Sequence, residues 1–190
     1  MPRDYTHARP TAFQRLPHYK RDEDWIRAFL RTAQVGHIAS SRDGQPFITP
    51  SLFWFDEDNH QIIFHSNVTG RIRSNLETNP RVCFEASEMG RLLPSNVALE
   101  FSVQYRSVVV FGTVRLLTDP AEARRALYGF IQKYFSAMQA GKEYRPITDK
   151  ELKHTSVYAI QIEEWSGKEN WKDRAMQSDE WTPLDEKWFI

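Results

Sequence analysis

The sequence predicts a mainly β protein in which an antiparallel barrel is flanked by peripheral helices. Three observations predict this fold: strand-like segments dominate the middle of the chain, most of them follow one another as hairpins, and helices do not alternate strictly with strands. A chain of 190 residues is long enough for one domain with a full core and short for two. We therefore expect an arm over residues 1–20, a barrel domain over 21–165, and a tail over 166–190 that docks on the barrel or on a dimer partner.

The N-terminal part predicts an extended arm followed by a short amphipathic helix. Residues 1–20 are polar and carry three prolines without any period, which is typical of a segment that wraps a surface. Asp22 and the two acidic residues after it supply an N-cap and a negative first turn, and apolar residues at helical spacing follow from Trp25 to Ala33. The helix is expected to end near Gly36.

Three strands joined by hairpin turns are expected next. They cover residues 35–41, 46–55 and 60–66, and the connections between them carry turn residues. A short helix capped by Thr69 and a strand over 81–87 follow. Residues 89–101 have weak periodicity and are expected to form a loop that could include a helical turn.

The second half predicts a long strand, a long helix and a final strand. Residues 105–117 are rich in valine and are interrupted at Gly112, where a bulge or a barrel bend is expected. Asp119 and Pro120 are typical of a helix start, and apolar residues recur every three or four positions as far as Met138. The last strand is expected over 156–162.

Composition limits the classes of function. Lysine plus arginine and aspartate plus glutamate each number 25, so nothing favours a nucleic-acid partner. No segment approaches the roughly 18 apolar residues of a membrane span. The single cysteine, Cys83, has no partner for an intramolecular disulfide and is expected to be a small buried side chain. The lone cysteine, the polar N-terminus and the lack of a membrane span favour a cytoplasmic protein. The six histidines form no close-spaced pair, so we expect no metal site.

Residues 64–71 form the clearest candidate for an anion site. A strand passes directly into a helix start there, which leaves backbone N–H groups unpaired at the positive end of the helix dipole. Thr69 offers a hydroxyl, Gly70 lets the backbone approach, and Arg71 adds a charged fork suited to phosphate. A capped helix with a solvated arginine is the alternative interpretation, and spacing alone does not exclude it.

His65 and Ser66 are a general base and a nucleophile by residue type, but neighbours on a strand point to opposite faces and cannot share a proton. The usual dinucleotide, nucleoside triphosphate and hydrolase signatures are absent from the sequence. His65 and Asn67 share a face beside the anion site, which makes His65 the candidate to donate a proton or orient a substrate. A hydrogen-bonded rim histidine is the alternative.

Six short segments, taken in order, carry a family resemblance. They are Gly36-His37-Ile38-Ala39-Ser40, Pro46-Phe47-Ile48-Thr49-Pro50, Ile63-Phe64-His65-Ser66, Thr69-Gly70-Arg71, Asn79-Pro80-Arg81-Val82-Cys83-Phe84 and Tyr105-Arg106-Ser107-Val108-Val109-Val110-Phe111-Gly112. Together they resemble the pyridoxamine 5′-phosphate oxidase-like FMN-binding split-barrel superfamily, and within it the nitroimidazole-resistance-like flavoproteins. The resemblance covers about residues 20–165. It implies a split β-barrel and a homodimer with two FMN molecules in the grooves between the chains.

The resemblance also implies which residues contact the cofactor. The phosphate contacts match Thr69 and Arg71, and Gly70 lies between them in the matching motif. The strand end beside the flavin matches His65, Ser66 and Asn67. The strand along the isoalloxazine ring and ribityl chain matches Thr49, Pro50, Ser51 and Leu52. Ser107 matches a polar contact from the other subunit, and Lys168 is either a second phosphate or ring contact or an exposed loop lysine.

The implied activity is an FMN-dependent oxidoreductase that passes electrons from a reduced nicotinamide donor to a small organic acceptor. True pyridoxamine phosphate oxidases have an arginine near the position of Thr49 and substrate-binding arginines in a closing C-terminal segment, so vitamin B6 oxidation is not expected here. A non-catalytic flavin or haem binding or storage protein is the alternative, and an apo-barrel that serves only as an interaction scaffold is a third possibility.

Overall fold

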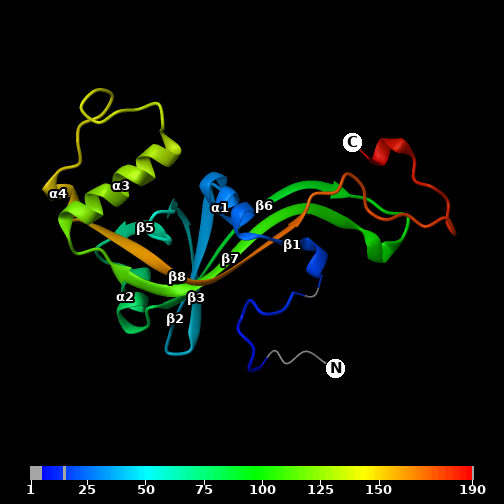
Figure 1. Ribbon diagram of the computed structural model, residues 1–190, viewed down its shortest axis with the longest axis horizontal. Helices are drawn as coiled ribbons and strands as arrows, with labels where there is room; N and C mark the ends of the chain where they lie inside the picture. The colour runs from blue at the N-terminus through cyan, green and yellow to red at the C-terminus, as the bar shows by residue number, and fades with distance from the viewer. Residues whose placement is uncertain (1–5, 15, 190) are drawn as a thin grey trace.

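The computed structural model describes residues 6–14 and 16–189, and its centre is one curved antiparallel sheet with helices at the ends and edges (Figure 1). The strands are β1 (Lys20–Arg21), β2 (Val35–Arg42), β3 (Gln45–Leu52), β4 (Trp54–Asp56), β5 (Gln61–Asn67), β6 (Arg81–Leu93), β7 (Ser102–Leu116) and β8 (Thr155–Asn170). The helices are α1 (Glu23–Thr32), α2 (Arg71–Thr78), α3 (Pro120–Tyr134) and α4 (Asp149–Leu152), with 3-10 turns η1 (Pro17–Tyr19), η2 (Ala98–Glu100) and η3 (Glu186–Trp188). The sheet order is β3-β2-β6-β7-β8-β5-β4, and β1 pairs with β8. The predicted mainly β fold with peripheral helices is confirmed.

Helix α1 forms where its capping signal predicts it. The Asp22 carboxylate accepts a hydrogen bond from the backbone N–H of Trp25 at 2.9 Å, which satisfies one free donor of the first turn. The predicted end near Gly36 is wrong, because Gly36 is already inside β2. A Cβ atom there would lie 2.2 Å from the Phe84 ring, so glycine is needed for core packing and does not cap the helix.

The predicted strand over 46–55 is split at Phe53. The Phe53 side chain is fully buried in the core. Its backbone N–H and carbonyl both bond to the Tyr134 hydroxyl, at 3.0 and 2.8 Å, instead of to a neighbouring strand. These two hydrogen bonds hold the backbone at the break between β3 and β4.

The predicted loop over 89–101 is confirmed for residues 94–101, which include the 3-10 turn η2, and is wrong for residues 89–93, which belong to β6. β6 continues to Leu93, with a register shift between Met89 and Leu92. Gly90 marks this irregularity, since a Cβ atom there would lie 2.7 Å from the Gln104 side chain. Only the tip of the β6–β7 hairpin, which holds Pro94 and η2, is irregular.

The last strand, β8, runs well past its predicted end at residue 162. The register between β7 and β8 shifts at Phe111 and Gly112, where a bulge was predicted, and a Cβ atom on Gly112 would lie 2.1 Å from the Gln161 carbonyl oxygen. Beyond the shift the pairing resumes as far as Asn170. Trp165 to Lys168 are therefore strand residues, and Lys168 is not in a loop.

Helix α3 ends at Tyr134, earlier than the apolar pattern predicts. Asp119 caps it by accepting a hydrogen bond from the Ala121 N–H at 3.1 Å, as predicted. Phe135 and Met138 are exposed, so the apolar pattern beyond Tyr134 has no core to pack against. Helix α4 was not predicted, and Thr148 and Glu151 begin it with a capping box.

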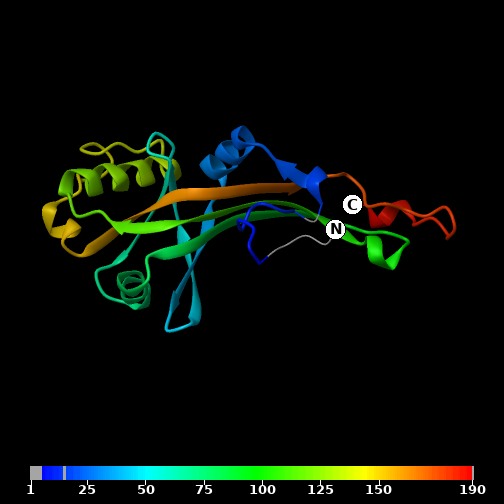
Figure 2. The same ribbon diagram turned by 60° about the horizontal axis from the view of Figure 1, so that its bottom comes forward.

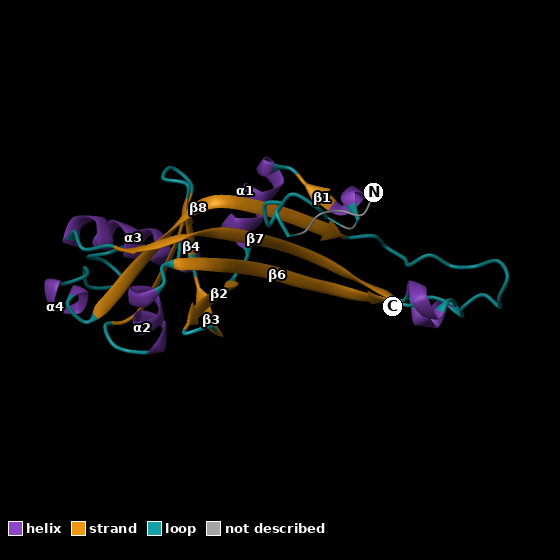
Figure 3. Cartoon of the chain, turned by 90° about the horizontal axis from the view of Figure 1, so that it is seen from below, coloured by secondary structure: helices purple, strands orange, loops and turns teal. Residues whose placement is uncertain are grey.

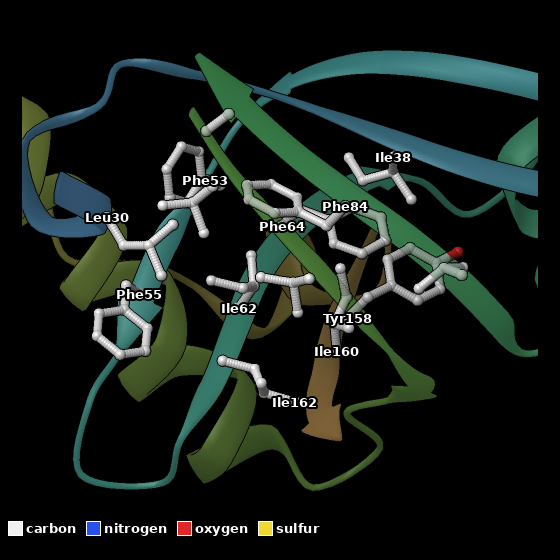
Figure 4. Close-up of a cluster of buried hydrophobic side chains, with 14 of the residues drawn as sticks. Leu30, Ile38, Phe53, Phe55, Ile62, Phe64, Phe84, Tyr158, Ile160 and Ile162 are labelled. Atoms are coloured by element: carbon white, nitrogen blue, oxygen red, sulfur yellow. The ribbon is translucent and has the colours of Figure 1, made fainter. Parts of the chain in front are cut away.

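The core lies at one end of the sheet, and the long strands project away from it. One buried cluster joins α1 and the inner faces of the strands, and Figure 4 shows its aromatic and aliphatic side chains. A second, smaller cluster lies beneath α3. β6, β7 and β8 extend beyond both clusters to the hairpin tip, where the C-terminal segment lies (Figures 2 and 3). No helix in the described part of the chain is long and apolar enough to cross a membrane.

The arm and the tail both contact the long strands. The Thr11 hydroxyl donates to the Glu164 carboxylate at 2.7 Å, and Lys20 and Arg21 pair with Lys168 and Gly167 of β8. In the tail, the backbone carbonyls of Met176 and Ser178 accept hydrogen bonds from Ser95 and Asn96 at the hairpin tip, at 2.6 and 2.8 Å. The two ends of the chain therefore pack on different parts of the same three-stranded extension.

Candidate functional site

The start of α2 is a helix N-terminus without a side-chain cap. The N-cap residue is Gly70, at φ 138° and ψ 176°, and no side chain in the described part of the chain caps the first helical N–H groups. The predicted cap, Thr69, is wrong, because its backbone N–H and its hydroxyl both donate to the Asn67 side-chain oxygen, at 3.1 and 3.2 Å. The backbone donors of the first turn are therefore free to bind an anion.

Arg71, the first residue of α2, supplies an uncommitted positive charge at this place. Its guanidinium lies 5.0 Å from the centre of the Phe47 ring, and it forms no ion pair with any described residue. Arg73, two positions further along the helix, is instead paired with Glu77. The helix start thus has free N–H groups, a positive dipole end and a free guanidinium.

The contact with Phe47 brings part of β3 to the same place. In the β2–β3 register Phe47, Thr49 and Ser51 lie on the face that points towards the barrel interior. Pro50 and Leu52 lie on the opposite, exposed face. Of the four predicted β3 contacts, only Thr49 and Ser51 therefore share a face with the residue that Arg71 touches, and the Ser51 hydroxyl donates to its neighbour's carbonyl at 2.7 Å.

His65 lies on the α3 side of β5. Its ring meets Phe130 edge-on, with 4.9 Å between the centroids, while the other side of the imidazole is open to solvent. This partial burial lowers the pKa of His65, which favours the neutral ring. Phe64 points the other way into the core, and the Ser66 hydroxyl donates to the Asn67 carbonyl at 3.0 Å.

Ser107 and Lys168 are register partners on β7 and β8, which are separated from β3 by β2 and β6. His65 pairs with Val157 on β8, eleven residues before Lys168. At about 3.3 Å per residue this is about 36 Å along the strand. The Lys168 ammonium instead lies 5.3 Å from the centre of the Tyr105 ring. A single chain therefore gathers the residues from Asn67 to Arg71 near β3 and leaves Ser107 and Lys168 elsewhere on the sheet.

The sequence interpretation missed a histidine–carboxylate pair on the open face of the sheet. His37 Nδ1 lies 3.0 Å from the Glu85 carboxylate, and His37 is opposite Pro50 in the register. Cys83, predicted to be buried, is half-buried because it shares this open face with Ala39, and burial raises the pKa of its thiol. His37 and Glu85 are 48 residues apart, so no local signal indicates their pairing.

A second missed feature lies at the β3–β4 break. The Lys133 ammonium donates to the carbonyls of Leu30 and Ala33 at 3.3 and 2.7 Å, and it lies 3.5 Å from the centre of the Phe53 ring. Burial lowers the pKa of Lys133 to about 7. The only sequence signal for Lys133 was its position as a basic residue in the last turn of an amphipathic helix.

Among residues 6–14 and 16–189, no three histidine, cysteine or acidic side chains gather to hold a metal ion.

Comparison with known proteins gives a family match and several similar structures. A family model described as pyridoxamine 5′-phosphate oxidase matches residues 22–169. The flavocytochrome Anf3 from Azotobacter vinelandii is 25% identical, with 90% of this chain and 77% of that chain covered and a TM-score of 0.76. A FAD and heme binding protein from Mycobacterium smegmatis is 24% identical, over 83% of this chain and 77% of that chain, with a TM-score of 0.70. A putative 5-nitroimidazole antibiotic resistance protein from Bacteroides thetaiotaomicron is 21% identical, over 77% and 83%, with a TM-score of 0.66. No curated protein matches the sequence.

Proposed function

Because the chain belongs to the pyridoxamine 5′-phosphate oxidase family, as its sequence motifs predict, we propose that it is a flavin-dependent oxidoreductase. The observation that carries the proposal is the uncapped start of α2, where Gly70 leaves the first N–H groups free and Arg71 has no acidic partner among residues 6–14 and 16–189. The flavocytochrome from Azotobacter vinelandii, which is similar over most of its length, also supports a flavin. FMN is the proposed cofactor, with its phosphate at this helix start.

The phosphate is held by backbone N–H groups, the helix dipole and the Arg71 guanidinium. These three elements suit a doubly charged phosphate because all of them favour negative charge. Thr69 contributes less, since its hydroxyl already donates to Asn67 and must break that bond in order to reach a phosphate. Thr49 and Ser51 face the same region from β3 and supply polar contacts along the cofactor.

The site is completed by a second copy of the chain. Lys168 lies about 36 Å along β8 from the position opposite His65, and its register partner Ser107 lies on β7, three strands from β3, so both are separated from the α2 start of their own chain. In a homodimer the face that carries Ser107 and Lys168 reaches the flavin of the partner. This arrangement explains how two separate groups of candidate residues serve one cofactor.

The bound flavin supplies electron transfer between a reduced nicotinamide donor and a small organic acceptor. The chain's own residues bind the cofactor, orient the acceptor and control protons. His65 has a lowered pKa, so at neutral pH its imidazole is neutral and offers one donor and one acceptor nitrogen to the acceptor molecule. Thr49 is neutral, which disfavours the phosphorylated substrate of true pyridoxamine phosphate oxidases.

Haem binding is the second candidate function, and one arrangement favours it. The Nδ1 atom of His37 is engaged by Glu85, which leaves Nε2 as the free ring nitrogen. A carboxylate on the far nitrogen is the usual support of an iron-ligating histidine. Val35, Ile48 and Leu52 are exposed apolar side chains on the same face and form a wall for a porphyrin.

The visible spectrum of the purified full-length protein, with mass spectrometry of the extracted chromophore, tests both candidates. Flavin absorption bands that bleach with NADH or NADPH under anaerobic conditions are the expected result. A Soret band that disappears in His37→Ala identifies the second candidate. Protein that is colourless and takes up no FMN on reconstitution contradicts the proposal.

A further inference from the structure

We infer that Arg42 of β2 is a second cation of the proposed phosphate site, so that two guanidiniums hold one phosphate-bearing group at the start of α2. The inference rests on the proposed flavin function. It adds a residue that lies outside both the segment 64–71 and the motifs that carry the family resemblance. Arg42 is the last residue of β2, and α2 packs beside this strand (Figure 1). Its side chain is 38% exposed, so a ligand can contact it.

The Arg42 side chain reaches the first turn of α2. Its Nη1 atom donates to the Ser74 hydroxyl, whereas Nη2 has no partner in the described part of the chain. The backbone N–H of Ser74 bonds to the Gly70 carbonyl at 3.1 Å, which makes Ser74 the first residue whose N–H group is used inside the helix. Side chains of a helix lean towards its N-terminus, so the Ser74 hydroxyl lies over the turn whose N–H groups are free. The Arg42 guanidinium therefore lies beside these donors.

Arg71 lies close to this position for two independent reasons. It comes three residues before Ser74, and side chains at this spacing are neighbours on one helix face, about 5–6 Å apart at Cβ. In the β2–β3 register Arg42 is opposite Gln45, and Phe47 is two residues further along β3 on the same face. Arg42 and Phe47 are therefore diagonal neighbours, roughly 7–8 Å apart. Because the Arg71 guanidinium lies 5.0 Å from the centre of the Phe47 ring, the helix and the sheet place both arginines at the same turn.

Acidic side chains oppose this concentration of positive charge only weakly. Among residues 6–14 and 16–189, Asp43 is the one acidic partner of either guanidinium, and its carboxylate lies 3.6 Å from the Arg42 Nε atom. Because Asp43 is 85% exposed at the hairpin turn, this ion pair contributes little. Glu77 on α2 is paired with Arg73. Two guanidiniums beside the positive end of a helix repel each other, and a phosphate group with a charge of about −2 relieves this repulsion.

Equilibrium titration of the purified full-length apoprotein with FMN and with riboflavin, followed by flavin fluorescence, tests the role of Arg42. Arg42→Gln keeps a donor for Ser74 but removes the charge, and we expect it to weaken FMN binding about tenfold because one charge-assisted hydrogen bond is lost. Riboflavin lacks the phosphate, so its affinity is expected to change less than about twofold. Arg115→Gln is the matched control. It removes an arginine whose ion pair is with Glu122 of α3, and it is expected to bind FMN as the natural chain does.

Three outcomes overturn the inference: FMN affinity that is unchanged in Arg42→Gln, an equal loss in Arg115→Gln, or an equal loss of riboflavin affinity in Arg42→Gln. FAD also carries two negative charges on its phosphates, so the same titrations with FAD distinguish the two sources of phosphate. Arg42→Gln is expected to weaken whichever nucleotide the natural chain binds more tightly, again about tenfold. A chain that binds none of these flavins refutes the proposed function itself, whereas binding that depends on Arg71 and not on Arg42 refutes only this inference.

Discussion

Replacing Arg71 with glutamine is the most direct test of the anion site at the start of α2. The guanidinium has no ion pair among the described residues and lies over the Phe47 ring, so its removal costs the fold little. A charge-assisted hydrogen bond contributes about 1.5–3 kcal/mol, and each 1.4 kcal/mol is about tenfold in affinity. We therefore expect Arg71→Gln to weaken FMN binding about 10- to 100-fold, with residual binding from the free N–H groups.

The measurement is an equilibrium titration of the apoprotein with FMN, followed by flavin fluorescence. Arg73→Gln is the matched control, because Arg73 is on the same helix but is already committed to Glu77 and Ser156. It is expected to change FMN affinity less than about threefold, while Arg71→Lys falls between the natural chain and Arg71→Gln. Unchanged affinity in Arg71→Gln, or an equal loss in Arg73→Gln, refutes the assignment of the phosphate to this helix start.

Three other predictions follow from the same geometry. Gly70→Ala places a side chain at φ 138°, a strain of about 1–3 kcal/mol, and should lower both the free energy of unfolding in urea and the affinity for FMN; equal stability would show that the backbone relaxes. Burial lowers the pKa of Lys133 from 10.5 to about 7. Between about pH 7 and pH 10.5 the unfolded chain therefore binds more protons than the folded chain, and the free energy of unfolding should rise with pH. Lys133→Met should lower the slope of unfolding free energy against pH by up to about 1.4 kcal/mol per pH unit. An unchanged slope would show that other groups cause it. Chains carrying Arg71→Gln, coexpressed with chains carrying Lys168→Met, should form mixed dimers that bind one FMN at full affinity per two chains, because one of the two sites is then intact; two weakened sites would exclude a shared site.

The parts of the fold that the sequence predicts are those specified by neighbouring residues. Asp22 and Asp119 cap their helices through backbone N–H groups two or three residues away, so both helix starts are visible in the sequence. The bulge at Gly112 can also be predicted from the sequence, because a glycine within a run of strand residues is itself a local signal. The end of β8 cannot be predicted in this way, because its pairing with β7 shifts register beside that bulge and the alternation of side chains is lost there.

The candidate site is only partly visible in the sequence. The strand-to-helix change at residues 67–71 predicts an anion site, but the cap was assigned to Thr69 because the sequence does not show that Asn67 takes both donors of that residue. His37 and Glu85 meet only because β2 pairs with β6. Lys133 meets Ala33 across 100 residues for a similar reason. Such contacts depend on the whole topology, and no local pattern encodes them.

The position of β8 in the sheet has a consequence for how the protein folds during synthesis. β8 leaves the ribosome after both of its neighbours in the sheet, β7 and β5, and Gln61 pairs with Gln161, which is 100 residues later in the chain. Until residues 155–170 have been synthesised, β7 and β5 each have an unpaired edge, and such edges are prone to pair with other chains. The high sequence separation of these contacts also predicts slow folding. We therefore expect nascent chains that stop before β8 to depend on chaperones more strongly than the finished protein does.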